Sequence, residues 1–335
     1  GVVSPQPAHV QEESEGLKMM VDNNPSLPVV RVADIVTEET REHWLIEQLW
    51  GASAVGVIGG PPKCSKTWLA LDMSLSVATG TACLDRYEVP LSGPVLVYLA
   101  EDSLAIVRER VEGIARHRGL QLNSVPIHVI LAPVLQLDRE PHRTQLLETA
   151  RQLRPRLLLL DPLVRLHGID ENHAGEVAEL LAYFRSLQRE LDLSVILVHH
   201  TRKNAAGGTA AGLGLRGSSD IHAFGDSNLY LRRTSERVML SSEHRAAAAA
   251  RSVYLELVAT DAETTHLAVT GDVGGEKRRD IQKRVLELLA ENSVLTRAKL
   301  REMLSIKNER LGEALESLQQ AGRISRTPTG WQRTP

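Results

Sequence analysis

The chain has 335 residues, of which 42% are hydrophobic, and its formal net charge at pH 7 is −3. This length and apolar content predict a globular protein with either two domains or one large core and an appendage. The longest apolar runs, at 157–160 and 195–198, have the length of strands, so we expect no membrane-spanning helix and no membrane partner. Two cysteines, Cys64 and Cys83, are too few for a disulfide framework or a zinc site.

The charge is distributed unevenly along the chain. Residues 275–335 contain 13 Lys and Arg against 8 Asp and Glu, a net charge of +5, which leaves −8 for residues 1–274. A basic end on an acidic body is typical of proteins whose tail faces nucleic acid, although a solvated surface has the same composition. The first residues lack the basic and then apolar order of a secretory signal, so the default expectation is a cytoplasmic location.

The predicted elements begin with a flexible N-terminal arm, residues 1–30, which is rich in Pro, Gln, Glu and Asn and has little apolar periodicity. A short helical pattern follows within 31–50. Strands and helices then alternate, which predicts a parallel sheet covered by helices on both faces. The expected strands are 54–58, 95–100, 127–131, 157–160 and 194–198, and the expected helices are 66–79, 104–118, 144–153 and 175–191.

Beyond His200 the pattern changes to consecutive short strands, which would extend the sheet in antiparallel fashion. They are expected at 228–233, 238–243, 253–259 and 265–270, and the alanine run at 246–250 is a hairpin connection rather than a helix. The fold class is therefore α/β, a phosphate-loop core over residues 31–271 with a mostly parallel central sheet extended by antiparallel strands. Residues 271–275 would serve as a linker.

The C-terminal domain, residues 272–335, shows three helical patterns of apolar residues. Thr296 and Asn308 are suitable N-caps for the second and third helices, and Gly322 would end the third. Strand patterns follow at 324–326 and 331–333, with a turn between them. Three helices and a terminal hairpin predict a winged helix-turn-helix domain.

The most informative motif is GGPPKCSKT at 59–67, which lies between a predicted strand and a predicted helix and matches the phosphate-binding loop G-x-x-x-x-[small]-K-[ST]. Lys66 would place a positive charge beside the β- and γ-phosphates, and Thr67 would ligate Mg²⁺. Ser65 stands where a glycine is usual, which allows for a strained backbone. An ordinary turn gives no reason for the Lys-Thr pair. The predicted nucleotide-binding residues are Gly60, Pro61, Pro62, Lys63, Cys64, Ser65, Lys66 and Thr67.

Carboxylates follow two of the predicted strands. Asp161 closes the run LLLLD, where it would share Mg²⁺ with Thr67, although an Asp can also cap the segment that follows. Glu101 follows the strand VLVYLA, where it would act as the catalytic base that orients and activates the attacking water. Asp102 would then cap the helix that begins near Ser103.

Two imidazoles, His199 and His200, follow a third predicted strand. A histidine pair alone is more often structural or half of a metal site, but no further ligands are apparent nearby, and sensing of the γ-phosphate fits better. Because the carboxyl ends of parallel strands meet at one edge of a sheet, we expect the carboxylates and these imidazoles around one ligand.

With these motifs the chain resembles the RecA-like ATPases, and within them the ring-forming group typified by plasmid RepA replicative helicases. The resemblance covers residues 30–260 and depends on the segments GGPPKCSKTWLALDMSLSVATG, VLVYLAEDS, RLLLLDPLVRLHG, VILVHHTRK and LRGSSDIHAFGDSNLYLRR. It implies ATP and Mg²⁺ as cofactors. It also implies the same roles for the site residues: phosphate and Mg²⁺ on Lys66 and Thr67, the metal on Asp161, the water on Glu101, and the γ-phosphate at His199 or His200.

The segment RGSS at 216–219 resembles the family's stretch whose arginine reaches the nucleotide of the neighbouring subunit. Arg216 would then be an arginine finger, which neutralises the charge that develops in phosphoryl transfer and makes hydrolysis depend on assembly. The resemblance therefore implies a homo-oligomer, most simply a hexameric ring with active sites between subunits. The alternatives are a surface arginine at a helix start, or Arg233 or Arg245 as the finger.

The resemblance also implies DNA contacts from the loops 167–174 and 201–215, and the second loop contains Arg202 and Lys203. An inert flexible loop has the same composition. Aromatic residues make up only 3% of the chain, so contacts with the backbone of single-stranded DNA would dominate over base stacking. In the winged helix the predicted DNA-binding residues are Arg301, Asn308, Arg310, Arg323, Arg326 and Arg333.

The winged helix is not part of the minimal RepA-type pattern, and Glu309, Glu313 and Glu316 on its third helix would repel phosphates. Docking onto a subunit or a partner protein therefore remains an alternative to DNA binding. The leading hypothesis is a P-loop ATPase that forms a ring and moves on single-stranded DNA, as a replicative-type helicase or translocase of a mobile element. The alternative is a switch that assembles on DNA without unwinding it. A small-molecule kinase has no use for the arginine segment or the winged helix.

Overall fold

The computed structural model describes residues 29–34, 43–171, 173–200, 219–234 and 237–334. The chain divides into two units, residues 1–41 and 42–335. In the first unit a 3₁₀ turn, Val32–Asp34, is described, and its Asp34 carboxylate pairs with the Arg31 guanidinium at 2.7 Å. The remainder of the predicted arm, 1–28, lies outside the described residues.

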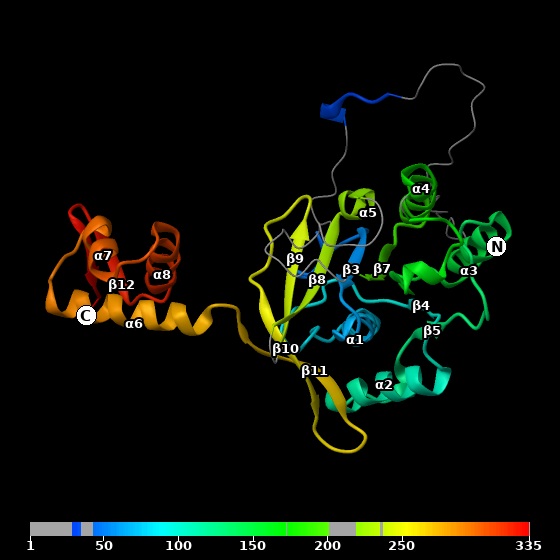
Figure 1. Ribbon diagram of the computed structural model, residues 1–335, viewed down its shortest axis with the longest axis horizontal. Helices are drawn as coiled ribbons and strands as arrows, with labels where there is room; N and C mark the ends of the chain where they lie inside the picture. Colours follow the sequence, from blue (N-terminus) through cyan, green and yellow to red (C-terminus); the bar gives the residue numbers. More distant parts are fainter. Residues whose placement is uncertain (1–28, 35–42, 172, 201–218, 235–236, 335) are drawn as a thin grey trace, which may run out of the picture. The chain divides into compact units, whose positions relative to one another are not determined.

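A nine-stranded sheet forms the centre of the second unit, with the strand order β11-β10-β9-β8-β3-β7-β6-β4-β5 (Figure 1). The strands from β8 to β5 are all parallel, and β9, β10 and β11 continue the sheet in antiparallel fashion. This arrangement confirms the predicted α/β class. The strands are β3 (Val55–Gly60), β4 (Val95–Leu99), β5 (Ile127–Val129), β6 (Leu157–Asp161), β7 (Ser194–His200), β8 (Ser227–Thr234), β9 (Arg237–His244), β10 (Val253–Ala259) and β11 (Thr265–Asp272).

Helices cover both faces of the sheet, as the alternation of strands and helices predicts. One face packs against α1 (Lys66–Thr79) and α2 (Leu104–His117), and the other packs against α3 (Glu140–Leu153), α4 (Ala174–Leu191) and α5 (Ser219–Phe224) (Figure 1). Because side chains alternate along a strand, the leucine run of β6 serves both cores: Leu157 and Leu159 pack with α1 and α2, and Leu158 and Leu160 pack on the opposite face.

A glycine in β3 is required by the closeness of its neighbour β8. A Cβ on Gly56 would collide with the carbonyl oxygen of Ser227, which is backbone and cannot turn aside. We expect Gly56→Ala to lower the free energy of unfolding by about 1–3 kcal/mol, measured by urea denaturation. Gly175→Ala in α4 is the control: nothing lies within 4 Å of its Cβ position, so about 0.5–1 kcal/mol of stabilisation is expected. Equal effects of the two substitutions would contradict the steric argument.

The helix predicted within 31–50 is wrong. Residues 44–51 form a small antiparallel hairpin of β1 (Trp44–Ile46) and β2 (Trp50–Gly51), and Gln48 in its turn has a left-handed φ of 61°. Leu45, Ile46, Leu49 and Trp50 are all buried in the same core as α1. Apolar residues at these spacings fit one face of a helix, but a tight turn at 47–49 brings them to the core from two short strands.

The C-terminal elements are those that the sequence predicts, with three helices and a two-stranded hairpin around their own apolar core. β11 runs to Asp272 and α6 begins at Gly275, so the connection is shorter than the predicted linker of 271–275. No helix among the described residues has the length and apolar character needed to cross a membrane. The elements are α6 (Gly275–Glu291), α7 (Arg297–Leu304), α8 (Asn308–Gln320), β12 (Ile324–Thr327) and β13 (Gly330–Arg333).

The predicted helix ends in this region are correct at two positions of three. Thr296 caps α7, because its hydroxyl accepts a hydrogen bond from the Lys299 amide at 3.2 Å. Gly322 follows α8 with a left-handed φ of 65°. The prediction for Asn308 is wrong: Lys307 occupies the N-cap position in extended conformation and Asn308 is the first helical residue. α8 therefore begins one residue earlier than it would with Asn308 as its N-cap.

Candidate functional site

The predicted phosphate-binding loop joins β3 to α1, with Gly60 as the last strand residue and Lys66 as the first helical residue. A Cβ on Gly60 would lie 2.6 Å from the Leu231 carbonyl oxygen and 2.8 Å from the Cys64 sulfur, so only glycine fits there. Ser65 adopts a left-handed φ of 65°, the conformation that the usual glycine provides without strain. For a serine this backbone conformation costs about 1–2 kcal/mol, and the strain remains in the folded loop.

Inside the loop, the Lys66 ammonium group is turned back toward backbone oxygens. It donates to the Gly60 carbonyl at 3.1 Å and to the Pro61 carbonyl at 2.8 Å, and burial lowers its pKa. The Cys64 thiol also donates to the Pro61 carbonyl, at 2.9 Å, and burial raises its pKa. Lys66 is therefore a buried cation held beside the loop, and the thiol of Cys64 is a loop-forming group rather than a nucleophile.

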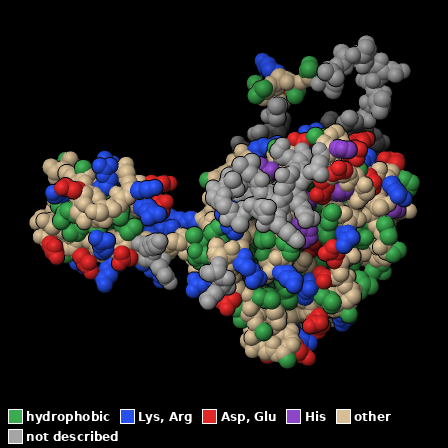
Figure 2. Space-filling view, viewed as in Figure 1, with side chains coloured by type: hydrophobic (Ala, Val, Ile, Leu, Met, Phe, Trp, Pro, Cys, Tyr) green, Lys and Arg blue, Asp and Glu red, His purple; other side chains and the backbone are tan. Residues whose placement is uncertain are grey.

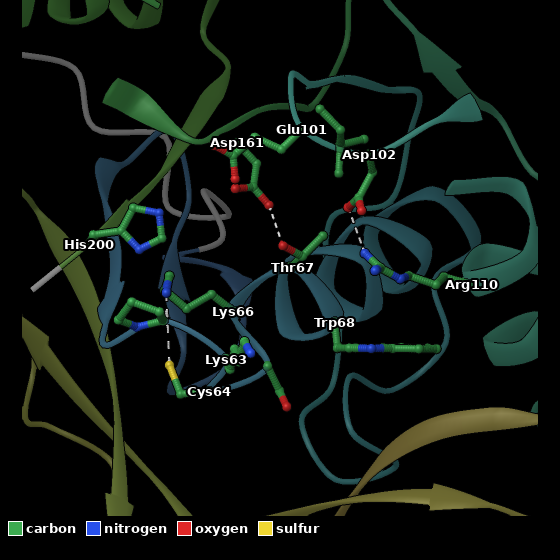
Figure 3. A pocket seen from close by; sticks show the side chains of 13 residues that line it. Lys63, Cys64, Lys66, Thr67, Trp68, Glu101, Asp102, Arg110, Asp161 and His200 are labelled. Atoms are coloured by element: carbon green, nitrogen blue, oxygen red, sulfur yellow. Dashed lines mark hydrogen bonds and ion pairs between the residues drawn. The ribbon is translucent and has the colours of Figure 1, made fainter. Parts of the chain in front are cut away.

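The loop forms one wall of a pocket of about 340 Å³ (Figure 3). Side chains from the ends of β4, β6 and β7 approach it from the sheet, as the convergence of parallel strand ends predicts. Of the eight predicted loop residues, six line the pocket, and Gly60 and Pro61 do not. The lining residues are Pro62, Lys63, Cys64, Ser65, Lys66, Thr67, Trp68, Leu99, Glu101, Asp102, Arg110, Asp161 and His200.

Thr67 and Asp161 meet within this pocket. The Thr67 hydroxyl donates to the Asp161 carboxylate at 2.7 Å, although the two residues are 94 positions apart in the chain (Figure 3). Burial raises the pKa of Asp161 to about 6, while the hydrogen bond from Thr67 and the charge of Lys66 act in the opposite direction. A hydroxyl and a carboxylate at this spacing are oxygen ligands suited to Mg²⁺, and a cation there would favour the ionised carboxylate.

Glu101 lies next to Asp161 on the same side of the pocket (Figure 3). Its carboxylate accepts a hydrogen bond from the Arg165 Nε at 2.9 Å, and both side chains are about half exposed. Glu101 therefore lines the pocket beside Asp161, and one of its oxygens is engaged by a cation. No sequence motif indicates this partner.

Asp102 does not cap α2, contrary to the sequence prediction. Ser103 is the N-cap of α2, and its hydroxyl accepts from the Ile106 amide at 3.4 Å. Asp102 instead pairs with Arg110 at 2.6 Å, and the Arg110 guanidinium lies 5.5 Å from the centre of the Trp68 ring. Trp68 and Arg110 are pocket residues that the sequence analysis missed. Asp102 precedes α2 and lies eight positions from Arg110, so the pair does not have the i,i+3 or i,i+4 spacing that marks neighbours on a helix.

The two histidines at the end of β7 lie in different surroundings. His200 lines the pocket across from Asp161, whereas His199 is 1% exposed and does not belong to the pocket lining (Figure 3). The Nδ1 atom of His199 lies 3.8 Å from the Glu171 carboxylate, which also lies 3.6 Å from the Nε2 atom of His167. Consecutive strand residues point to opposite sides, so only one of the pair can reach the ligand.

Three predicted site residues, Arg216, Arg202 and Lys203, lie outside the described residues. The two substitutes for the arginine finger are held within their own chain. Arg233 donates to the Lys63 carbonyl at 2.8 Å, and Arg245 donates to the Ala223 carbonyl at 3.0 Å and faces Asp226. Arg233 thus supports the phosphate-binding loop of its own chain.

Comparison with known proteins identifies the family of this site. A family model for the AAA domain matches residues 23–206, which is more than half of the chain and contains the phosphate-binding loop, Glu101, Asp161 and His200. The chain belongs to the AAA domain family. Among solved structures it is similar to the crystal structure of the RadB recombinase, with 17% sequence identity and a TM-score of 0.47 over 62% of this chain and 88% of that one. Membership of the AAA domain family agrees with the expected P-loop ATPase.

The predicted DNA-binding residues of the C-terminal part lie on its surface, but acidic groups accompany them. Figure 2 shows Lys and Arg interspersed with Asp and Glu over these helices on the face in view. On α8, Arg310 lines a second pocket of about 310 Å³ together with Glu309 and Glu313. The exposed candidates are Arg301 on α7, Asn308 and Arg310 on α8, and Arg323, Arg326 and Arg333 in and beside the hairpin.

Proposed function

We propose that this chain hydrolyses ATP with Mg²⁺ and is the RecA-like motor subunit of a ring that moves on DNA. The observation that carries the proposal is the hydrogen bond from Thr67 to Asp161, beside the phosphate-binding loop and with Glu101 at the same strand edge. This combination supports the proposal, because it would put metal ligands and a base around a bound γ-phosphate, and a loop that only binds nucleotide has no need of the base.

Each pocket residue has a role in the proposed reaction. The Lys66 ammonium, released from the Gly60 and Pro61 carbonyls, would bind phosphate oxygens, and Thr67 and Asp161 would hold Mg²⁺, which supplies positive charge at the phosphates. Glu101 would take a proton from the attacking water as the bond between the γ-phosphorus and the bridging oxygen breaks. His200 would hydrogen bond to the γ-phosphate, whose presence it would then report.

The contact between Glu101 and Arg165 should lower the rate of ATP hydrolysis by a measurable amount. The Arg165 guanidinium occupies one oxygen of the Glu101 carboxylate at 2.9 Å, so that oxygen is not available to accept a proton from water. We expect Arg165→Ala to raise the steady-state rate of ATP hydrolysis up to about fivefold, because an exposed pair contributes about 0–1 kcal/mol. Arg165→Lys, which keeps the charge, should stay close to the unsubstituted rate. A rate below one tenth in Arg165→Ala would show that Arg165 contributes to hydrolysis instead.

The proposal assigns Arg216 as the finger that completes the pocket of the neighbouring subunit. Lys66→Ala and Arg216→Ala should each abolish ATP hydrolysis, and mixing the two inactive proteins should restore part of it. In a randomly mixed ring, roughly a quarter of the interfaces join an intact loop to an intact finger. No recovery on mixing, with both variants assembled to the size of the unsubstituted protein, would overturn the assignment in trans.

The C-terminal part is proposed to be a winged helix that contacts DNA phosphates through its hairpin. The triple substitution Arg323→Ala, Arg326→Ala and Arg333→Ala should flatten the salt dependence of DNA binding, with a slope change of about 0.7–0.9 for each phosphate that the protein no longer neutralises. Lys283→Ala on α6, an exposed cation outside the hairpin, is the control. An unchanged slope would favour docking onto a protein.

Unwinding separates the motor from the alternative, a switch that assembles on DNA. A strand-displacement assay should show ATP-dependent unwinding by the unsubstituted protein and none by Lys66→Ala. ATP hydrolysis that is stimulated by single-stranded DNA without any strand displacement would exclude a helicase and leave the switch.

A further inference from the structure

A cluster of two imidazoles and a carboxylate lies apart from the nucleotide pocket. Asp85 follows α1, His117 is the last residue of α2, and His266 lies in β11. One ligand atom from each residue lies within 4.8 Å of the other two. The three residues are 32 to 181 positions apart in the chain, so the tertiary structure alone brings them together. None of them lines the pocket that contains Thr67 and Asp161.

We propose that Asp85, His117 and His266 bind a divalent transition-metal ion of the zinc type. The carboxylate of Asp85 already lies 2.7 Å from the His117 Nε2 atom, and the rings of His117 and His266 are stacked with centroids 3.4 Å apart. In a bound state all three side chains would turn their ligand atoms toward one ion, at distances of about 2.0–2.2 Å. Asp85 and His117 are the more exposed of the three and have the freedom to make this adjustment.

His266 provides a second observation that points to a ligand. It is 94% buried (6% exposed), and its Nδ1 atom has no hydrogen-bond partner among the described residues. A buried ring nitrogen without a partner is costly, and coordination of a metal ion is one way to satisfy the imidazole.

The backbone around the cluster is held in place by neighbouring contacts. The Leu84 amide, next to Asp85, donates to the buried Asp72 carboxylate at 2.9 Å. At the end of α2, Arg118 pairs with Asp72 at 2.7 Å, and Arg116 pairs with Glu263 in the turn that leads into β11. The charge of Arg118 is offset by Asp72 and leaves Asp85 as the anion for a bound cation. A metal site requires such fixed supports for its ligands.

The ligand types select the ion. Two imidazoles and one carboxylate are typical of zinc and related first-row metals, whereas Mg²⁺ and Ca²⁺ prefer oxygen ligands. Two cysteines are too few for a zinc site made of thiolates, but this exclusion does not extend to a zinc site made of histidine and aspartate. Three protein ligands leave the fourth tetrahedral position to water, and the bound ion would join α2 to β11 and to the segment after α1.

The test uses the full chain after treatment with a chelator and dialysis, with Mg²⁺ and an ATP analogue added to occupy the nucleotide pocket. Zn²⁺ binding is measured by competition with a chromogenic chelator, and Co²⁺ is used as a spectroscopic substitute. We expect one Zn²⁺ per chain with a Kd of about 1 μM or tighter, a visible absorption band of tetrahedral Co²⁺, and a melting temperature that rises by a few degrees with Zn²⁺.

Asp85→Asn and His117→Gln should each weaken Zn²⁺ binding at least about tenfold, since the loss of a supporting group alone costs about 10–100-fold. Both side chains are partly exposed, so the variants should keep the unsubstituted circular dichroism spectrum. Matched controls are His128→Gln, an exposed histidine of β5, and Asp161→Asn in the nucleotide pocket. Wild-type Zn²⁺ affinity in both Asp85→Asn and His117→Gln, or no binding tighter than about 100 μM in the unsubstituted chain, would overturn the proposal and leave only an ion pair and a ring stack.

Discussion

Glu101→Gln is expected to lower the rate of ATP hydrolysis by about 10²–10⁴-fold while nucleotide binding stays within a few-fold of its original strength. Glutamine keeps the size of the side chain but cannot accept the proton of the attacking water. Glu101 contacts Arg165 rather than the loop, so its loss should leave Lys66 and Thr67 free to hold the phosphates. Single-turnover hydrolysis and the binding of a fluorescent ATP analogue measure the two effects separately.

Glu109→Gln provides the matched control for this experiment, because Glu109 is an exposed glutamate of α2 that does not line the pocket. It should hydrolyse ATP at the unsubstituted rate. If Glu101→Gln retained more than about a tenth of the original rate, general base catalysis by Glu101 would be excluded, and Asp102 would become the carboxylate to test next.

The largest expected effect on stability comes from Asp72→Ala. Asp72 is 2% exposed, and one of its oxygens accepts from the Arg118 guanidinium at 2.7 Å and from the Leu84 amide at 2.9 Å. Alanine would leave the buried charge of Arg118 without its partner, which typically costs about 3–5 kcal/mol. Urea denaturation should therefore show a markedly lower transition midpoint with an unchanged slope.

Two further variants distinguish an unpaired charge from a simple loss of packing. Replacing both partners, as in Asp72→Leu with Arg118→Met, should recover much of the stability, since no charge is then left buried. Glu190→Ala, which breaks the exposed contact with Arg151, should change stability by less than about 1 kcal/mol. A cost below about 1 kcal/mol for Asp72→Ala would show that Arg118 finds adequate partners in Ser76 and Thr81.

Local sequence patterns were sufficient for most of the fold. The bounds of α1 were predicted to the residue, and β10 likewise, because a helix or strand with a regular apolar pattern depends on the residues within it. The hairpin at 44–51 was missed for the same reason: its apolar spacing suits a helix, and the choice between the two depends on burial against α1, which no local window contains.

The candidate site was predictable to the extent that its residues belong to contiguous motifs. The loop at 59–67, Glu101 and Asp161 are each marked by a strand that ends next to them, and the structure brings them to one pocket. The sequence could not show which of His199 and His200 faces that pocket. Their orientation depends on the register of β7 beside β3, which hydrogen bonds between distant segments determine.

The sequence by itself therefore determined most of the strands and helices, the phosphate-binding loop and the carboxylates at the strand ends, because each of these is encoded in a short run of residues. Only the tertiary structure decided that Arg165 engages Glu101 and that Asp85, His117 and His266 meet. The physical reason is that such pairs join segments far apart in the chain, and their proximity results from the packing of helices on the sheet.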